Sequence, residues 1–147
     1  MMKTFIFLLT FVFVSFTGLY AQENNSNKVK WQLYSELNGV RIYSKKVECN
    51  DVHNGIFSEY VYFQIVNTTD VAMSVSWDEE IWRDNKCMSC GKNPAEFHTE
   101  FIIDAGDIIE PTCKIKPELK IFSKFLNNIS SSELTKFKLN NLTVNPL

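Results

Sequence analysis

The segment Phe57-Ser-Glu-Tyr-Val-Tyr-Phe-Gln-Ile-Val66 decides the fold class of this chain. Apolar side chains occupy every second position in its second half, and a period of two residues is typical of a β-strand with one buried face. The side chains that this alternation predicts to face the core are Val61, Phe63 and Ile65. Those that it predicts to face outward are Tyr60, Tyr62 and Gln64.

The same alternation recurs on both sides of this segment, and turn residues separate the repeats. Trp31–Glu36 and Val40–Cys49 flank Asn38-Gly39, a dipeptide typical of a tight hairpin turn. Asn50–Gly55 is interpreted as a loop, and one face of the next strand is expected to carry Val71, Met73, Val75 and Trp77. Further strands are expected around Phe97–Ile103, Leu119–Leu126 and Glu133–Val144, the last with a bulge at Asn140-Asn141. About seven to nine short strands without βαβ alternation predict an antiparallel immunoglobulin-like β-sandwich.

The N-terminus has the three features of an export signal. Lys3 supplies the positive charge, Phe5–Phe16 is a largely apolar run, and Leu19-Tyr20-Ala21 ends in a small residue. We therefore expect a signal peptide over 1–21, a flexible leader over 22–30 and one β-sandwich domain over 31–147. Because the apolar run is shorter than the roughly 20 residues of a membrane-spanning helix, no span is expected after cleavage. The expected location is the extracellular space, the periplasm or the cell envelope.

Four cysteines lie beyond the predicted signal: Cys49, Cys87, Cys90 and Cys113. An even number of cysteines in an exported chain predicts disulfide bonds. Four cysteines allow three pairings, and spacing alone does not select one of them. We favour Cys87 with Cys90, which form a ready local loop, and Cys49 with Cys113, which lie at the ends of predicted strands.

The Cys87-x-x-Cys90 spacing also occurs in redox-active dithiols and in half of a zinc site. Its flanks indicate a strand followed by a loop, whereas a redox dithiol usually lies at a helix N-terminus, so a structural disulfide is favoured. A thiol-disulfide active protein that uses this pair remains the alternative function. His53 and His98 lack a second ligand at short spacing, and the acidic run Asp78-Glu79-Glu80 lacks a calcium-loop pattern, so the run is interpreted as a solvated turn.

No catalytic motif is present, since neither a phosphate-binding glycine loop nor a Gly-x-Ser-x-Gly elbow nor a His-Glu-x-x-His pair occurs. We therefore expect a non-enzymatic protein without a metal or cofactor. The formal net charge of −2 argues against nucleic-acid binding, which usually requires a basic domain.

The charge is unevenly distributed along the chain. Residues 22–113 contain eight basic and fifteen acidic residues, a net charge of −7, whereas residues 114–147 contain six lysines and two acids, a net charge of +4. The lysines of this candidate basic binding face are Lys114, Lys116, Lys120, Lys124, Lys136 and Lys138. Aromatic side chains expected at least partly outside the core add Tyr60, Tyr62 and Trp82. Such a face suits an anionic polysaccharide or an acidic protein partner, and the alternative is that the lysines protect exposed strand edges.

The chain resembles the small secreted β-sandwich proteins of unassigned function from flavobacteria and related Bacteroidota. The features that carry the resemblance are a bias toward Lys, Asn, Ile and Phe, the signal ending Leu19-Tyr20-Ala21-Gln22, Trp31–Tyr43, Tyr60–Asn67, Trp77–Cys90, Phe137-x-Leu139 and Leu142-x-Val144. The resemblance implies an exported sandwich and brings no known activity. We therefore expect an exported, disulfide-stabilised binding or accessory module.

Overall fold

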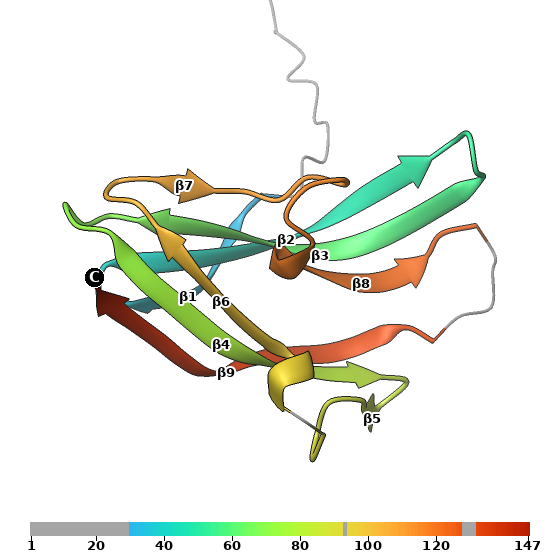
Figure 1. Ribbon diagram of the computed structural model, residues 1–147. Coiled ribbons are helices and arrows are strands. Elements are labelled where there is room, and N and C mark those ends of the chain that lie inside the picture. The colour runs from blue at the N-terminus through green and yellow to red at the C-terminus, as the bar shows by residue number, and fades with distance from the viewer. Residues whose placement is uncertain (1–29, 93, 128–131) are drawn as a thin grey trace, which may run out of the picture.

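The computed structural model describes residues 30–92, 94–127 and 132–147, and it is an all-β structure (Figure 1). The predicted signal peptide 1–21, and all of the predicted leader except Lys30, lie outside the described residues. The strands are β1 Gln32–Leu37, β2 Val40–Asp51, β3 Ile56–Asn67, β4 Met73–Arg83, β5 Lys86–Cys87, β6 His98–Ile103, β7 Ile108–Ile109, β8 Lys120–Phe125 and β9 Leu134–Pro146. Two single 3₁₀ turns, η1 Pro94–Glu96 and η2 Pro117–Leu119, complete the elements.

The strands form two antiparallel sheets, which Figure 1 shows as separate layers. Sheet A has the order β1-β2-β3, and both β7 and β8 pair with the free edge of β3. In sheet B, β4 lies between β9 on one edge and β5 and β6 on the other. The chain therefore crosses between layers after β3, after β6 and after β8.

Two short sequence signals set the register of these sheets as predicted. Asn38 and Gly39 both have positive φ, 47° and 80°, which matches the two-residue turn that joins β1 to β2. In β9, the pairing with β4 shifts between Ser76 and Asp78, because two residues of β9 oppose one residue of β4. Asn141 has φ 51° at this shift, so the predicted bulge is confirmed.

Some strand limits differ from expectation because cross-strand pairing extends further than the alternation of the sequence. The β2–β3 hairpin continues to Asp51 opposite Ile56, which shortens the predicted loop to the turn that joins them. Val71 is 45% exposed and precedes β4, so its predicted place on the buried face is wrong.

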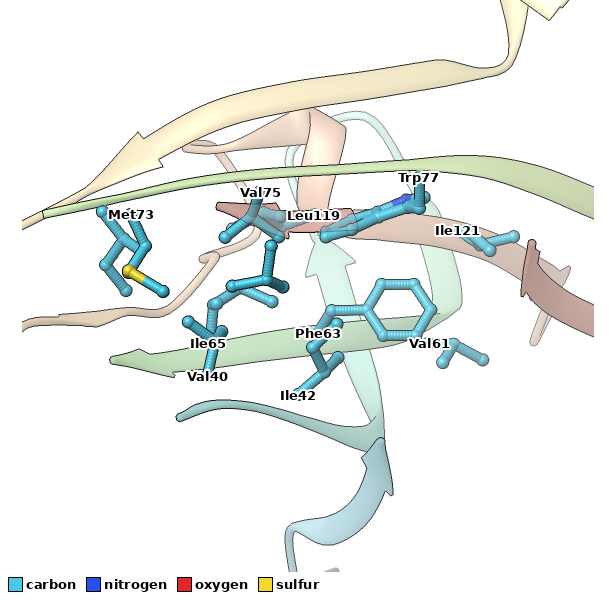
Figure 2. Packing of buried hydrophobic residues seen from close by; sticks show 12 residues of the cluster. Val40, Ile42, Val61, Phe63, Ile65, Met73, Val75, Trp77, Leu119 and Ile121 are labelled. Atoms are coloured by element: carbon cyan, nitrogen blue, oxygen red, sulfur yellow. The ribbon is translucent and has the colours of Figure 1, made fainter. Parts of the chain in front are cut away.

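The core lies between the two sheets, and the central strand of each layer contributes most to it. Val61, Phe63 and Ile65 of β3 are buried as predicted, and Phe63 lies edge-on to Trp77 of β4 at 6.3 Å between ring centroids. Figure 2 shows these two rings meeting from opposite layers. Burial of each such side chain stabilises the fold by about 1.5–3 kcal/mol. The other core members are Val40, Ile42, Met73, Val75, Ile103, Leu119, Ile121 and Val144.

Side chains join the layers at their edges by hydrogen bonds to main-chain atoms. On β9, the carbonyl of Val144 accepts from Nδ2 of Asn38 at 2.8 Å, and the N–H of Leu139 donates to the hydroxyl of Tyr34 at 2.9 Å. On the opposite side, Nη2 of Arg83 donates to the carbonyl of Phe122 in β8 at 2.6 Å. These bonds satisfy main-chain polar groups of β8 and β9, which are the outer strands of their sheets.

Candidate functional site

Both favoured cysteine pairings are confirmed. Cys49 and Cys113 are bonded across a sequence separation of 64 residues, and Cys87 and Cys90 across a separation of three. In the chain-entropy treatment the longer loop stabilises by about 4 kcal/mol and the shorter by about 2 kcal/mol. The Cys49–Cys113 bond is therefore the main covalent constraint on the fold.

This bond fastens an outer loop, residues 110–116, onto the outer face of sheet A. At the start of the loop, the Glu110 carboxylate accepts from Nζ of Lys45 at 3.4 Å and from Nε2 of Gln64 at 3.0 Å. Beyond its end, Nζ of Lys120 donates to the carbonyls of Thr112 at 3.2 Å and Cys113 at 2.8 Å. The sheet thus holds the loop by ionic, polar and covalent contacts along its length.

Tyr62 lies under this constraint and is only 3% exposed. Its hydroxyl is 2.9 Å from Sγ of Cys49, and burial raises the pKa of the phenol. The expectation that Tyr62 forms part of an exposed binding surface is therefore wrong. The alternation correctly places it on the face of β3 opposite Val61 and Phe63, but the sequence pattern does not reveal what covers that face.

An open hollow of about 460 Å³ lies beside the Cys49–Cys113 bond. Its lining residues are Cys49, Asn50, Asp51, Val52, Ile56, Ser58, Tyr60, Cys113 and Lys114. The Tyr60 ring packs edge-on against Phe122 at 5.5 Å between centroids, and Nζ of Lys120 lies 5.5 Å from its centroid. Two of the candidate residues, Tyr60 and Lys114, therefore line this concavity, and a third, Lys120, lies against the Tyr60 ring.

The remaining candidate lysines are divided between the two sheets. Lys116 pairs with Glu118 and Lys124 with Glu133, each at 3.7 Å, near or on β8. Lys136 and Lys138 are on β9, which belongs to sheet B. The two last long strands join different sheets, and closeness in sequence does not reveal this.

Trp82 lies in a separate cluster on sheet B. Nζ of Lys136 is 4.9 Å from the centroid of the Trp82 ring, and the indole N–H donates to Oε1 of Glu80 at 2.7 Å. Glu80 also accepts from Nδ2 of Asn140 at 3.1 Å, and these donors lower the pKa of its carboxyl. The Trp82 cluster is therefore a polar patch with its own internal pairing, distinct from the Tyr60 hollow.

A second, smaller hollow of about 140 Å³ lies in sheet B beside the Cys87–Cys90 bond. Its lining residues are Asp78, Glu79, Glu80, Ser89, Cys90, Lys92, Phe97, Asn140 and Asn141. The acidic run 78–80 is part of β4, so its interpretation as a solvated turn is wrong.

Glu79 is half-buried and is the member of this acidic run whose carboxyl has a raised pKa. Burial raises its pKa to about 7. The Trp77 indole opposes this rise, but its Nε1 is out of hydrogen-bonding geometry with any acceptor of the described residues, so burial dominates. In β4, Glu79 occupies the same face of the strand as Val75 and Trp77, because side chains two residues apart point to the same side. This alternation is the sequence signal that separates Glu79 from Asp78 and Glu80.

Asp78 lies on the other face of β4, and the pKa of its carboxyl is lowered rather than raised. Its carboxylate accepts from Nδ2 of Asn141 at 2.7 Å and contacts Nδ1 of His98 at 2.8 Å, and these partners lower its pKa. Across residues 30–92, 94–127 and 132–147, no group of three or more His, Cys, Asp or Glu side chains is arranged to hold a metal ion. The same residues contain no helix of the length and apolarity needed to cross a bilayer.

Comparison of the chain with protein-family models, with curated proteins and with solved structures gives no match in any of the three.

Proposed function

We propose that the protein is exported and acts outside the cytoplasm as a non-enzymatic binding module with an immunoglobulin-like sandwich fold. The export signal over 1–21 and the absence of any free cysteine among the described residues both support this proposal. Disulfides persist in oxidising compartments. The Cys49–Cys113 disulfide, whose cysteines are 64 residues apart, therefore suits a domain that acts outside the cytoplasm.

Strand order supports the immunoglobulin-like part of the proposal. In such domains, strands A, B and E are neighbours in one sheet, and F, C and C′ are neighbours in the other. Here β2-β3-β8 and β9-β4-β6 have these orders, and the chain passes through them in the sequence A, B, C, C′, E, F. β1 is an additional strand at the edge of sheet A.

The hollow beside Cys49–Cys113 carries the binding part of the proposal. It has a volume of about 460 Å³, and its lining includes the half-buried Tyr60 together with Asn50 and Lys114. Binding sites for small ligands combine an apolar or aromatic wall with a few placed polar groups. The disulfide holds the outer loop against the sheet, so that these groups are already positioned before the ligand arrives.

The chemistry of this lining suits a polysaccharide that carries acidic groups. An aromatic ring provides a flat apolar surface for a sugar ring, and the amide group of the exposed Asn50 matches sugar hydroxyls. Lys114 on the rim and Lys120 above Tyr60 supply positive charge for a carboxylate or sulfate. Asp51 on the same rim favours a ligand with spaced rather than contiguous acidic groups, since adjacent charges would meet its carboxylate.

Binding is tested by titrating the mature chain with dextran sulfate and with uncharged dextran, which share a backbone and differ in charge. We expect saturable binding of dextran sulfate at the lower degrees of substitution and at least tenfold weaker binding by Lys114→Gln and by Lys120→Gln. Lys138→Gln, on sheet B, is the matched control and should bind as the unmodified chain does. Equal losses in all three variants would mean general attraction between charges, and no binding of either dextran would contradict the polysaccharide assignment.

Export is tested separately, by expressing the full chain in a bacterium and determining the mass of the protein recovered outside the cytoplasm. The expected mass is that of a chain beginning at Gln22 with four cysteines oxidised. A product that stays in the cytoplasm with an intact residue 1 would contradict export while leaving the binding result interpretable.

A further inference from the structure

The Cys87–Cys90 bond differs from Cys49–Cys113 in the burial of its less exposed cysteine and in the length of the loop that it closes. Each bond has one exposed cysteine, Cys90 or Cys113, but Cys87 is half-buried whereas Cys49 is buried against Tyr62. Exposed disulfides are the ones that exchange, while buried disulfides that close long loops resist reduction. The two bonds therefore differ in how deeply the second sulfur is covered, which favours exchange at Cys87–Cys90 over exchange at Cys49–Cys113.

The loop that carries Cys87–Cys90 is held in place independently of the disulfide. The N–H of Met88 donates to the carbonyl of Ile81 at 2.8 Å, and the N–H of Ile81 donates to the hydroxyl of Ser89 at 2.9 Å. Cys87 itself pairs with Trp82 in the β4–β5 ladder. Because these contacts involve neither sulfur, opening the disulfide leaves the loop attached to β4.

We propose that Cys87–Cys90 is a thiol–disulfide exchange site, at which a dithiol of a partner protein is oxidised and Cys90 is the sulfur that the partner attacks. This proposal does not rest on ligand binding at the Tyr60 hollow, which lies in the other sheet. It gives a role to the small hollow of sheet B, which the proposed binding function does not use.

The exchange balances in two steps. A partner thiolate attacks Sγ of Cys90, the Cys87–Cys90 bond breaks, and its electron pair leaves on Sγ of Cys87 as a thiolate. The N–H of Cys90 points at that sulfur at 3.1 Å and stabilises the negative charge. The partner's second thiolate then attacks its own sulfur in the mixed disulfide, which releases the Cys90 thiolate and leaves the partner with a disulfide. A low-molecular-weight disulfide such as glutathione disulfide restores the Cys87–Cys90 bond by the reverse steps.

Glu79 is among the residues that line the same hollow as Cys90, although its position in β4 has the inward parity of Val75 and Trp77. As part of the proposal, we assign to its carboxyl the proton that the released Cys90 thiolate takes up. Its pKa, raised to about 7 by burial, keeps the carboxyl protonated in weakly acidic solution. The charged groups around it are Asp78 and Glu80 on β4, Lys92 on the cysteine loop and His98 on β6, which pairs with Asp78. Asn140 and Asn141 face the hollow from β9 without charge.

The test equilibrates the oxidised mature chain with mixtures of reduced and oxidised glutathione, followed by acid quenching, alkylation of free thiols and peptide mass spectrometry. We expect Cys87 and Cys90 to become alkylated in mixtures that leave Cys49–Cys113 oxidised, with the circular dichroism spectrum unchanged. At early times, glutathione should be found on Cys90 at least ten times as often as on Cys87. The proposal is overturned if the two disulfides resist reduction alike, if reduction of Cys87–Cys90 unfolds the domain, or if glutathione is found mainly on Cys87.

A matched pair isolates the contribution of Glu79. The measured quantity is the ratio of two reduction rates, that of the unmodified chain divided by that of Glu79→Gln. We expect this ratio to fall several-fold between pH 5.5 and pH 8.5. Once the Glu79 carboxyl is ionised, it no longer donates a proton, and its negative charge opposes formation of the thiolate. Glu100→Gln, on β6 and outside the hollow, is the control and should give a constant ratio. A constant ratio for Glu79→Gln as well would remove Glu79 from the exchange.

Discussion

The hydroxyl of Tyr62 lies 2.9 Å from Sγ of Cys49, beneath the loop that the Cys49–Cys113 bond fastens to sheet A. The loop and this contact bury the Tyr62 side chain on the outer face of β3, away from the core between the sheets. The Tyr62 side chain is therefore a structural residue on a face that the sequence indicates as solvent-facing.

Truncation of Tyr62 tests this burial. We expect Tyr62→Ala to lower the free energy of unfolding by about 3 kcal/mol, as for other buried aromatic side chains, and Tyr62→Phe to lower it by about 1 kcal/mol through loss of the hydroxyl contact. Urea denaturation followed by tryptophan fluorescence measures both. A change below 0.5 kcal/mol for Tyr62→Ala would show that the outer loop does not bury this ring in solution.

The two disulfides are expected to differ in their contribution to stability. Replacing Cys49 and Cys113 together with serine should cost about 4 kcal/mol, and replacing Cys87 and Cys90 together should cost about 2 kcal/mol or less, since the closed loops differ greatly in length. Thermal denaturation of the two double variants compares them directly. Equal losses would mean that Cys87–Cys90 is also a structural constraint, which would weigh against exchange at that pair.

Gly39 is required at the β1–β2 turn for two separate reasons. Its φ of 80° disfavours any residue with a Cβ, and a Cβ at this position would collide with Cγ2 of Thr69. Gly39→Ala should therefore destabilise by more than the roughly 1–2 kcal/mol of backbone strain alone. Gly106→Ala is the matched control, because Gly106 has φ 68° and open space around the added Cβ. Chemical denaturation should give the larger loss for Gly39→Ala, and equal losses would mean that Thr69 moves aside without cost.

The buried Glu79 carboxyl predicts that stability falls as pH rises through neutrality. Its pKa of about 7 in the folded chain lies above the ordinary value of 4.5, so the folded state binds the proton more tightly than the unfolded state does. The resulting stabilisation is complete below pH 4.5 and is lost as pH rises through 7, a change of about 3 kcal/mol. Asp78 and Glu80 have lowered pKa values and act in the opposite sense at more acidic pH.

Glu79→Gln isolates this effect. Between pH 5 and pH 8 the free energy of unfolding of the unmodified chain should decrease relative to that of the variant, as measured by urea denaturation at each pH. Parallel curves for the two proteins over this range would show that the carboxyl is solvated rather than buried.

Local patterns were sufficient to predict several parts of the fold. Asn38-Gly39 predicted a turn, the slip of apolar spacing at Asn140-Asn141 predicted a bulge, and the alternation in β3 predicted which side chains reach the core. Each of these features depends on conformational preferences of a few adjacent residues, which the sequence states directly. The cysteine pairing was also predicted. Cys87 and Cys90 are close in sequence, and pairing them leaves Cys49 for Cys113.

The candidate site was predicted only in part. Tyr60 and Lys114 line one hollow, and Lys120 lies against the Tyr60 ring. Tyr62, however, is covered, and Lys136 and Lys138 belong to the other sheet. The acidic run alone does not separate Glu79 from Asp78 and Glu80, whereas in the folded chain the pKa of Glu79 is raised and the pKa values of its two neighbours are lowered.

The sequence by itself determined the all-β class, the main turns, the inward side chains of β3 and the even number of cysteines available for pairing. Only the tertiary structure decided which strands share a sheet, that the outer loop covers Tyr62, and that Cys90 and Glu79 line one hollow. The physical reason is range: turn and strand preferences act between adjacent residues, whereas layer assignment, burial and pKa depend on groups brought together from distant parts of the chain.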